Sequence, residues 1–185
     1  MRPFASTIAF VLAAGAVAAQ SPLPLSEGPY TYRVLGLFSK DREADLRASF
    51  ELLPEFKLSK VDFDYAEITV AFAPAKLFPG QKAERVAELV NDRLRQASHH
   101  TFGVKPRSTA ARDKLQRVEI PAGGLDCKAC CLAAYEIVAQ IDGVEQATAS
   151  FKEGKVTALI DPARTDRAKL EETLRKRGVL AGPLK

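Results

Sequence analysis

The sequence predicts an α+β fold built from two tandem copies of one unit, which we expect to run strand, helix, strand, strand, helix, strand. Residues 36–76 align with residues 124–164 without a gap at an offset of 88, and seven positions are identical, among them Gly36/Gly124. Apolar residues agree at further aligned positions, which favours a true internal duplication. A chain that is 46% hydrophobic and 27% charged is also ordinary for globular domains.

Each element of the first copy is predicted by its pattern of apolar residues. Residues 41–53 carry Leu46, Phe50 and Leu53 at helical spacing, whereas residues 61–72 alternate as a hairpin does. The expected elements are a strand at 30–38, a helix at 41–53, strands at 61–65 and 68–72, a helix at 82–97 and a short strand at 102–104.

The second copy repeats this order after a polar segment. The expected elements are a strand at 117–120, a helix at 128–141, strands at 145–152 and 155–160, and a helix at 166–176. Glu153 and Gly154 form the expected hairpin turn, and Gly178 is placed to end the last helix. Each copy is thus a predicted ferredoxin-like βαββαβ sandwich, with two helices on one face of an antiparallel sheet.

The segments outside the copies set the boundaries. Arg2, an apolar run at 8–19 and small residues at its end are typical of a cleavable signal peptide, with an uncleaved anchor as the alternative. We expect a periplasmic or secreted protein with no membrane span in its mature form. The predicted divisions are a signal peptide at 1–19, a tether at 20–28, a first domain at 29–106, a linker at 107–116 and a second domain at 117–183.

Several functional classes are excluded or disfavoured. The two histidines are the adjacent His99 and His100, so a cage of several histidines cannot form. No Walker, zincin or nucleophile-elbow motif occurs, and we expect no enzyme activity. The formal charge of +4 is spread without a basic stripe, which disfavours a nucleic-acid partner.

The chemistry concentrates in a C-x-x-C motif, Cys127 and Cys130, between a predicted strand and a predicted helix. Their i, i+3 spacing points both sulfurs the same way, and the helix N-terminus favours the thiolate form. Two thiolates without a nearby histidine suit a soft ion such as Cu(I) or Hg(II), whereas structural zinc needs four ligands. A redox-active pair and an inert disulfide are the alternatives for an exported protein.

These residues carry a resemblance to a known family. Residues 117–180 resemble a heavy-metal-associated domain, the fold of copper chaperones, of the periplasmic mercury-binding protein and of N-terminal modules in metal-exporting P-type ATPases. That family carries Gly-Met-[Thr/Asp]-Cys-x-x-Cys, which Gly124, Asp126, Cys127 and Cys130 match. The resemblance implies that both cysteines bind metal.

Two substitutions and one shared residue qualify the resemblance. Leu125 replaces the usual methionine with little change in volume, and Val179 stands where many members have an aromatic residue near the metal. Asp126 resembles the variant found in zinc- and lead-exporting ATPases, where the aspartate joins the coordination. It therefore favours a divalent ion such as Zn(II) or Cd(II), with helix N-capping as the alternative role.

Other candidates have simpler explanations beside a functional one. Cys131 is a third candidate ligand, but it lies on the predicted core-facing stripe of its helix. In the first copy, Ser39 and Arg42 stand at the places of Cys127 and Cys130, so this copy is a degenerate one without a site for a soft cation. The His99–His100 pair is interpreted as a helix C-terminal cap, with surface metal binding as the alternative.

The predicted function is capture and hand-over, or sequestration, of one soft or borderline metal ion. The expected partner besides the ion is a metal transporter or another metal-binding protein. A thiol–disulfide redox protein and a pure interaction module are the alternative functions.

Overall fold

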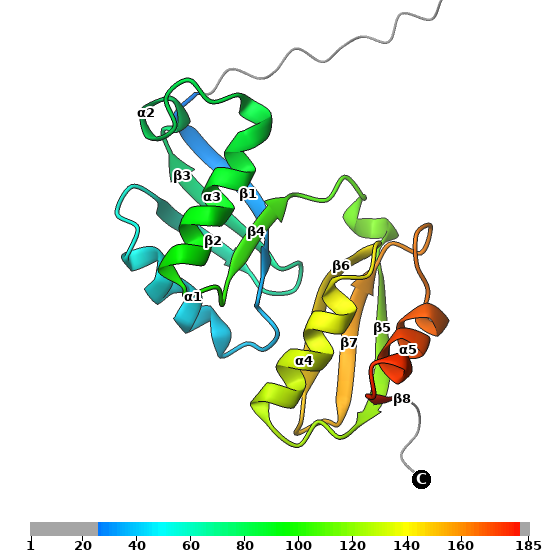
Figure 1. Cartoon of the computed structure of the whole chain (residues 1–185). Coiled ribbons are helices and arrows are strands. Elements are labelled where there is room, and N and C mark those ends of the chain that lie inside the picture. Colours follow the sequence, from blue (N-terminus) through cyan, green and yellow to red (C-terminus); the bar gives the residue numbers. More distant parts are fainter. Residues whose placement is uncertain (1–25, 182–185) are drawn as a thin grey trace, which may run out of the picture.

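The computed structural model describes residues 26–181, so the predicted signal peptide and residues 20–25 of the predicted tether lie outside the described residues. The described chain forms two α+β units, each with a four-stranded antiparallel sheet covered on one face by helices (Figure 1). Within residues 26–181, none of the helices has the length and apolar character that a membrane crossing requires.

The first unit follows the predicted order with one additional short helix. It consists of β1 (Gly28–Leu35), α1 (Arg42–Glu51), β2 (Lys57–Asp62), β3 (Glu67–Phe72), α2 (Pro74–Leu77), α3 (Ala83–Ala97) and β4 (Gly103–Pro106). Its sheet has the strand order β2-β3-β1-β4. The extra helix α2 begins with a proline, which suits the first helical position because a backbone N–H is not needed there.

The second unit repeats this topology. After a 3₁₀ turn η1 (Arg112–Lys114), it consists of β5 (Gln116–Gly123), α4 (Lys128–Ala139), β6 (Val144–Ser150), β7 (Lys155–Ile160), α5 (Arg167–Lys176) and β8 (Leu180–Ala181). Its sheet has the equivalent order β6-β7-β5-β8. The predicted tandem ferredoxin-like fold is confirmed.

Strand register confirms the duplication at the predicted offset. Thr31 pairs with Thr69 across β1 and β3, and Glu119 pairs with Thr157 across β5 and β7. Both members of the second pair lie 88 residues after their counterparts. A shared register means that the same side chains face the core in both copies, because side chains alternate along a strand.

Some predicted boundaries are wrong. Strand β1 begins at Gly28 and so includes the end of the predicted tether, and β2 ends at Asp62. The hairpin turn therefore takes up Phe63 and Tyr65, which alternation alone assigned to a strand. Apolar alternation does not distinguish the end of a strand from a turn whose side chains still pack on the core.

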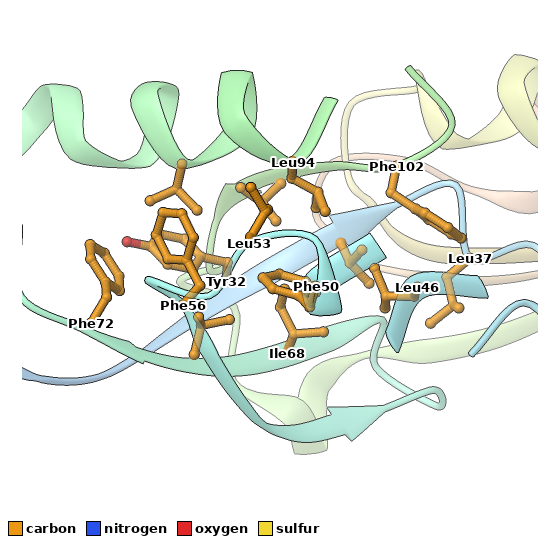
Figure 2. Close-up of a cluster of buried hydrophobic side chains, with 14 of the residues drawn as sticks. Tyr32, Leu37, Leu46, Phe50, Leu53, Phe56, Ile68, Phe72, Leu94 and Phe102 are labelled. Carbon is orange, nitrogen blue, oxygen red and sulfur yellow. The ribbon is translucent and has the colours of Figure 1, made fainter. Parts of the chain in front are cut away.

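The first core lies between the helices and the sheet of that unit. Figure 2 shows Tyr32, Phe56 and Phe72 at one end of this cluster and Leu37, Leu46 and Phe102 at the other. The β1–α1 loop, residues 36–41, leaves the core at the Leu37 end. This loop is the counterpart of the cysteine loop in the second copy.

The second core contains a side chain from the first copy. Phe38 is only 6% exposed and belongs to the same buried cluster as Cys131, Tyr135 and Ala149. Its ring centroid lies 6.0 Å from that of Tyr135. Burying a side chain of this size contributes about 2 kcal/mol from the apolar area removed from water. The two copies are therefore packed together rather than only linked.

Backbone hydrogen bonds join the same loop to the second unit. The Gly36 N–H donates to the hydroxyl of Tyr135 on α4 at 2.8 Å, and both groups are buried. The Ala149 N–H on edge strand β6 donates to the Phe38 carbonyl at 3.2 Å. Because unpaired N–H groups along an edge strand are open to other chains, this contact also protects that edge.

Polar side chains complete the contact between the copies. Arg33 on β1 donates from Nη1 to Glu145 Oε2 on β6 at 3.3 Å, with side chains only 14% and 7% exposed. The Gln146 amide donates from Nε2 to the Phe63 carbonyl at 3.4 Å. Either charge would be buried without a partner if the two units moved apart at this point, so the ion pair favours the observed arrangement of the units.

The predicted linker lies along the first unit. Arg107 donates from Nε to Glu67 at 2.8 Å, and Arg112 pairs with the same carboxylate. The Arg112 guanidinium also lies 3.9 Å from the ring centroid of Tyr65. The segment between the units is thus held by ion pairs and a cation–π contact to the β2–β3 hairpin, which a polar, aperiodic sequence did not indicate.

Candidate metal-binding loop

The cysteine motif lies on the loop that joins β5 to α4. Gly124 adopts φ +78°, a left-handed conformation that favours glycine, and it turns the chain out of β5. Leu125 is 5% exposed and packs in the second core, so its side chain anchors the loop to that core. Residues 126–129, at the end of the loop and the start of α4, are exposed to solvent.

Cys127 is the residue that caps α4. Its backbone is extended, and its Sγ accepts the Cys130 N–H at 3.3 Å. The Sγ atoms of Cys127 and Cys130 lie 2.7 Å apart, and both are free thiols. N-capping by Asp126, one of the two roles expected for it, is therefore wrong, because the thiol one position later takes the cap.

The two thiols differ in acidity because one hydrogen bond joins them. The Cys130 thiol as donor lowers the pKa of Cys127, and backbone N–H groups at the start of α4 lower it further. The same hydrogen bond raises the pKa of Cys130. Cys127 is thus the more acidic thiol of the pair and is exposed, while Cys130 is half-buried. An exposed thiolate is the nucleophilic and metal-ligating form of cysteine.

Asp126 is exposed and lies close enough to oppose this effect, since its carboxylate raises the pKa of Cys127. Within residues 26–181, no three His, Cys, Asp or Glu side chains are gathered in a way that could hold a metal ion. The structure therefore brings Cys127 and Cys130 together but does not assemble Asp126 with them as a third ligand.

Cys131 packs in the core. It is 1% exposed, and its neighbours along the helix, Ala134 and Val138, are fully buried in the same cluster. Burial raises the pKa of the Cys131 thiol, which keeps it protonated. The core-facing stripe predicted for this helix is confirmed, while the pairing of Cys131 with a metal stays a prediction.

Lys128, between the two cysteines, meets the first copy. Its Nζ lies 3.3 Å from Asp41 Oδ2, in an ion pair between the copies whose two side chains are 76% and 60% exposed. Beside this pair is a cavity of about 420 Å³, lined by residues of both copies that include Phe38, Cys131 and Phe151. Phe151 is 47% exposed at the mouth of this region.

The corresponding loop of the first copy holds no thiol. Ser39 donates from its hydroxyl to Asp41 at 2.6 Å, and Arg42 donates to Asp45 at 2.8 Å. The Arg42 guanidinium lies over the rings of Phe38 and Phe102, at 5.4 and 5.0 Å from their centroids. A permanent cation thus occupies the position where the second copy has Cys130.

The histidine pair follows helix α3. Ser98 ends the helix, and His99 and His100 both have positive φ, with the His100 N–H donating to the Arg95 carbonyl at 2.7 Å. The pair therefore ends α3, with the His100 backbone N–H bonded to a carbonyl of its last turn; a role for the histidine charge there stays a prediction. His100 also lines a cavity of about 180 Å³ between the copies.

Comparison with known proteins gives likenesses of structure alone. No family model matches this chain, and no curated protein sequence is significantly similar to it. The chain is similar to oxidized MerP from Ralstonia metallidurans CH34, at 22% identity over 37% of this chain and 94% of MerP, with a TM-score of 0.35. The element order and the strand order confirm the ferredoxin-like fold that the heavy-metal-associated resemblance implies.

Two further solved structures are similar to the chain. One is the Cu(I)-loaded N-terminal domain of a potential copper-translocating P-type ATPase from Bacillus subtilis, at 25% identity, covering 36% of this chain and 84% of that one, with a TM-score of 0.35. The other comprises the N-terminal soluble domains of Bacillus subtilis CopA, at 16% identity, covering 84% of this chain and 92% of that one, with a TM-score of 0.34.

Sequence reasoning missed the residues that join the loop to the first copy. The sequence contained an indication at Phe38, because a large apolar residue stands there at the position that the exposed Asp126 occupies in the second copy. Tyr135 and Glu145 carried none, since a tyrosine on a helix and a glutamate in a strand are equally compatible with solvent.

Proposed function

We propose that this protein binds one soft or borderline metal ion through Cys127 and Cys130 and passes it to, or withholds it from, other metal-binding proteins. The observation that carries the proposal is the pair of free thiols at the start of α4, 2.7 Å apart, with the pKa of Cys127 lowered. Thiolates are the ligands that Cu(I), Hg(II), Cd(II) and Zn(II) share.

The two cysteines have separate roles in this proposal. The Cys127 thiolate meets the ion first, because it is exposed and already favoured in its charged form. Cys130 then loses its proton as the second metal–sulfur bond forms, which ends the hydrogen bond between the two sulfurs. The helix N–H groups stabilise the negative charge that the two thiolates bring. Release follows the reverse order, as a partner's thiolates replace one sulfur at a time, and no catalytic turnover is involved.

The test is native mass spectrometry of the reduced full chain under anaerobic conditions, offered Cu(I), Zn(II), Cd(II) or Hg(II) against a competing chelator. We expect one ion per chain, and loss of that ion in Cys127→Ser/Cys130→Ser. Cys131→Ala is the matched control, and it should retain the ion. A double variant that binds as tightly as the parent chain would overturn the proposal.

The identity of the ion decides the role of Asp126. Preference for Zn(II) or Cd(II) that is lost in Asp126→Asn would make this carboxylate a third ligand, brought in when the ion binds. Preference for Cu(I) or Hg(II), unchanged in Asp126→Asn, would assign the site to the two thiolates alone.

A thiol–disulfide redox function is the second candidate, because the same asymmetric pair of thiols also suits disulfide exchange. A lowered pKa on an exposed cysteine and a protonated neighbour at 2.7 Å are the features of an attacking and a resolving thiol. Reduction of insulin disulfides by the parent chain, with no metal retained, would favour this candidate.

Export is part of the proposal and rests on the sequence of residues 1–19. Determination of the N-terminus of the protein recovered from the periplasm or the medium tests it. A chain that still begins at Met1 in the cytoplasm would contradict export without bearing on metal binding.

A further inference from the structure

The end of the first copy that corresponds to a metal site is covered by the second copy. Strand register identifies this end: Leu35 pairs with Gly103, as Gly123 pairs with Leu180, so the loop at 36–41 is the counterpart of 124–129. That loop gives the Gly36 and Phe38 hydrogen bonds to the second unit. The β2–β3 turn at the same end gives the Phe63 contact.

The covered end contains a cation of its own. The register places Phe102, just before β4, at the counterpart of Val179 before β8. Arg42, the counterpart of Cys130, lies between the rings of Phe102 and Phe38. A guanidinium over two aromatic faces is attracted by both rings, and its charge does not depend on pH in the physiological range. Asp45 holds the guanidinium from the side.

The position of Phe38 follows from this arrangement. The Phe38 ring packs in the core of the second copy, and the Arg42 guanidinium of the first copy lies over the same ring. Its carbonyl accepts the N–H of edge strand β6. Arg42 therefore contacts an aromatic residue of the first copy that packs in the core of the second.

We infer that the first copy is a built-in docking partner of the second, and that Arg42 replaces a metal ion as the cation that orders the docking loop. The degenerate loop thus retains a function, as a protein-binding surface. It also covers the flank of α4 beside Cys131, so that an incoming metal-transfer partner reaches Cys127 and Cys130 from the opposite flank. The docking itself does not depend on the proposed metal binding.

The first test is hydrogen exchange of the ¹⁵N-labelled full chain, followed at the amides of Gly36 and Ala149, which bond across the two copies. Arg42→Met keeps an unbranched side chain about as long as the aliphatic part of arginine and removes the guanidinium with its charge. We expect exchange at both amides to become at least tenfold faster, with little change at Val156 inside the second sheet. Arg47→Met is the matched control, because Arg47 is exposed on the same helix.

Three outcomes would overturn the inference. These are unchanged exchange at Gly36 and Ala149, an equal effect of Arg47→Met, and a rise that is as large at Ile68 in the core of the first sheet. The last outcome would mean that Arg42 supports the folding of the first unit rather than its docking. Arg42→Lys, which keeps the charge but not the planar group, should fall between the parent chain and Arg42→Met.

The second test measures how well the first copy shields the Cys131 thiol on α4 from solvent. In a Cys127→Ser/Cys130→Ser background, Cys131 is the remaining thiol, and its labelling by a maleimide reports access to the buried cluster. We expect Phe38→Ala to speed this labelling at least tenfold. Leu52→Ala, which shortens a 67% exposed side chain elsewhere on the first copy, should leave the rate unchanged. Equal rates in Phe38→Ala and the parent background would contradict the docking role of Phe38.

Discussion

The hydroxyl of Tyr135 offers the most direct measurement of how strongly the two copies hold each other. It accepts the Gly36 N–H at 2.8 Å, and the surroundings are buried on both sides. Tyr135→Phe keeps the ring against Phe38 and removes only the acceptor. A buried donor left without a partner costs about 1–3 kcal/mol. Since about 1.4 kcal/mol is a factor of ten, the separated state of the two units should become about 5- to 150-fold more populated.

Amide exchange at Ala149, whose bond to the Phe38 carbonyl spans the same contact and is left intact, measures this separation, and urea unfolding gives the accompanying change in stability. We expect faster exchange at Gly36 and at Ala149, which belongs to the same contact. Tyr30→Phe is the control, because the Tyr30 hydroxyl donates to the Ser26 carbonyl at an exposed position. Its effect should stay within about 0.5 kcal/mol. Exchange at Gly36 that is equally slow in Tyr135→Phe and the parent chain would refute the contribution assigned to this bond.

Three further predictions concern the thiols, the buried ion pair and alkaline pH. The hydrogen bond from residue 130 is the main cause of the lowered pKa of Cys127, so Cys130→Ala should raise that pKa more than Cys130→Ser, which retains a donor hydroxyl. The pH dependence of Cys127 labelling by iodoacetamide measures this pKa, and equal values in the two variants would contradict this cause. Glu145→Gln should lower the free energy of unfolding in urea by about 3 kcal/mol, because Arg33 is left with a buried charge that has no partner. Arg33→Met/Glu145→Leu removes both charges and should lower it by less; a double variant as unstable as Glu145→Gln would contradict that reasoning. Burial raises the pKa of Tyr32 to about 12, so the stability that its neutral form contributes is present in full below pH 10 and is lost as pH rises from about 10 to 12. Burial also raises the pKa of Tyr135, so phenolate absorbance at 295 nm should show a late phase from both residues, which Tyr32→Phe should reduce; an unchanged late phase in Tyr32→Phe would contradict this assignment.

Much of the architecture was predictable from local patterns. The 88-residue offset, found from seven identities, agrees with the register of both sheets, because alternation along paired strands leaves little freedom once one face is buried. Helix α3 was predicted almost to its ends, since four apolar residues on one face of a long helix form a clear pattern. The placing of Cys127 before α4 and Cys130 in its first turn was also predicted correctly.

Other features depend on neighbours that no local pattern contains. The N-cap of α4 went to Cys127 rather than Asp126, because the path of the loop after Gly124 decides which side chain faces the free N–H groups. The end of β2 was missed because Phe63 packs from a turn as well as from a strand. The pairing of Lys128 with Asp41 joins residues 87 positions apart and carries no periodic signal.

The sequence by itself determined the two copies, their strands and helices, and the pair of cysteines at a helix start, because hydrophobic period and helix-end chemistry are properties of short segments. Only the tertiary structure decided how the copies meet: Phe38 enters the second core, Arg42 lies over the Phe38 ring, and Tyr135 receives a hydrogen bond from Gly36. These contacts join loops to surfaces far away in the chain. Their free energy comes from burying groups whose partners are defined only once both sheets have formed.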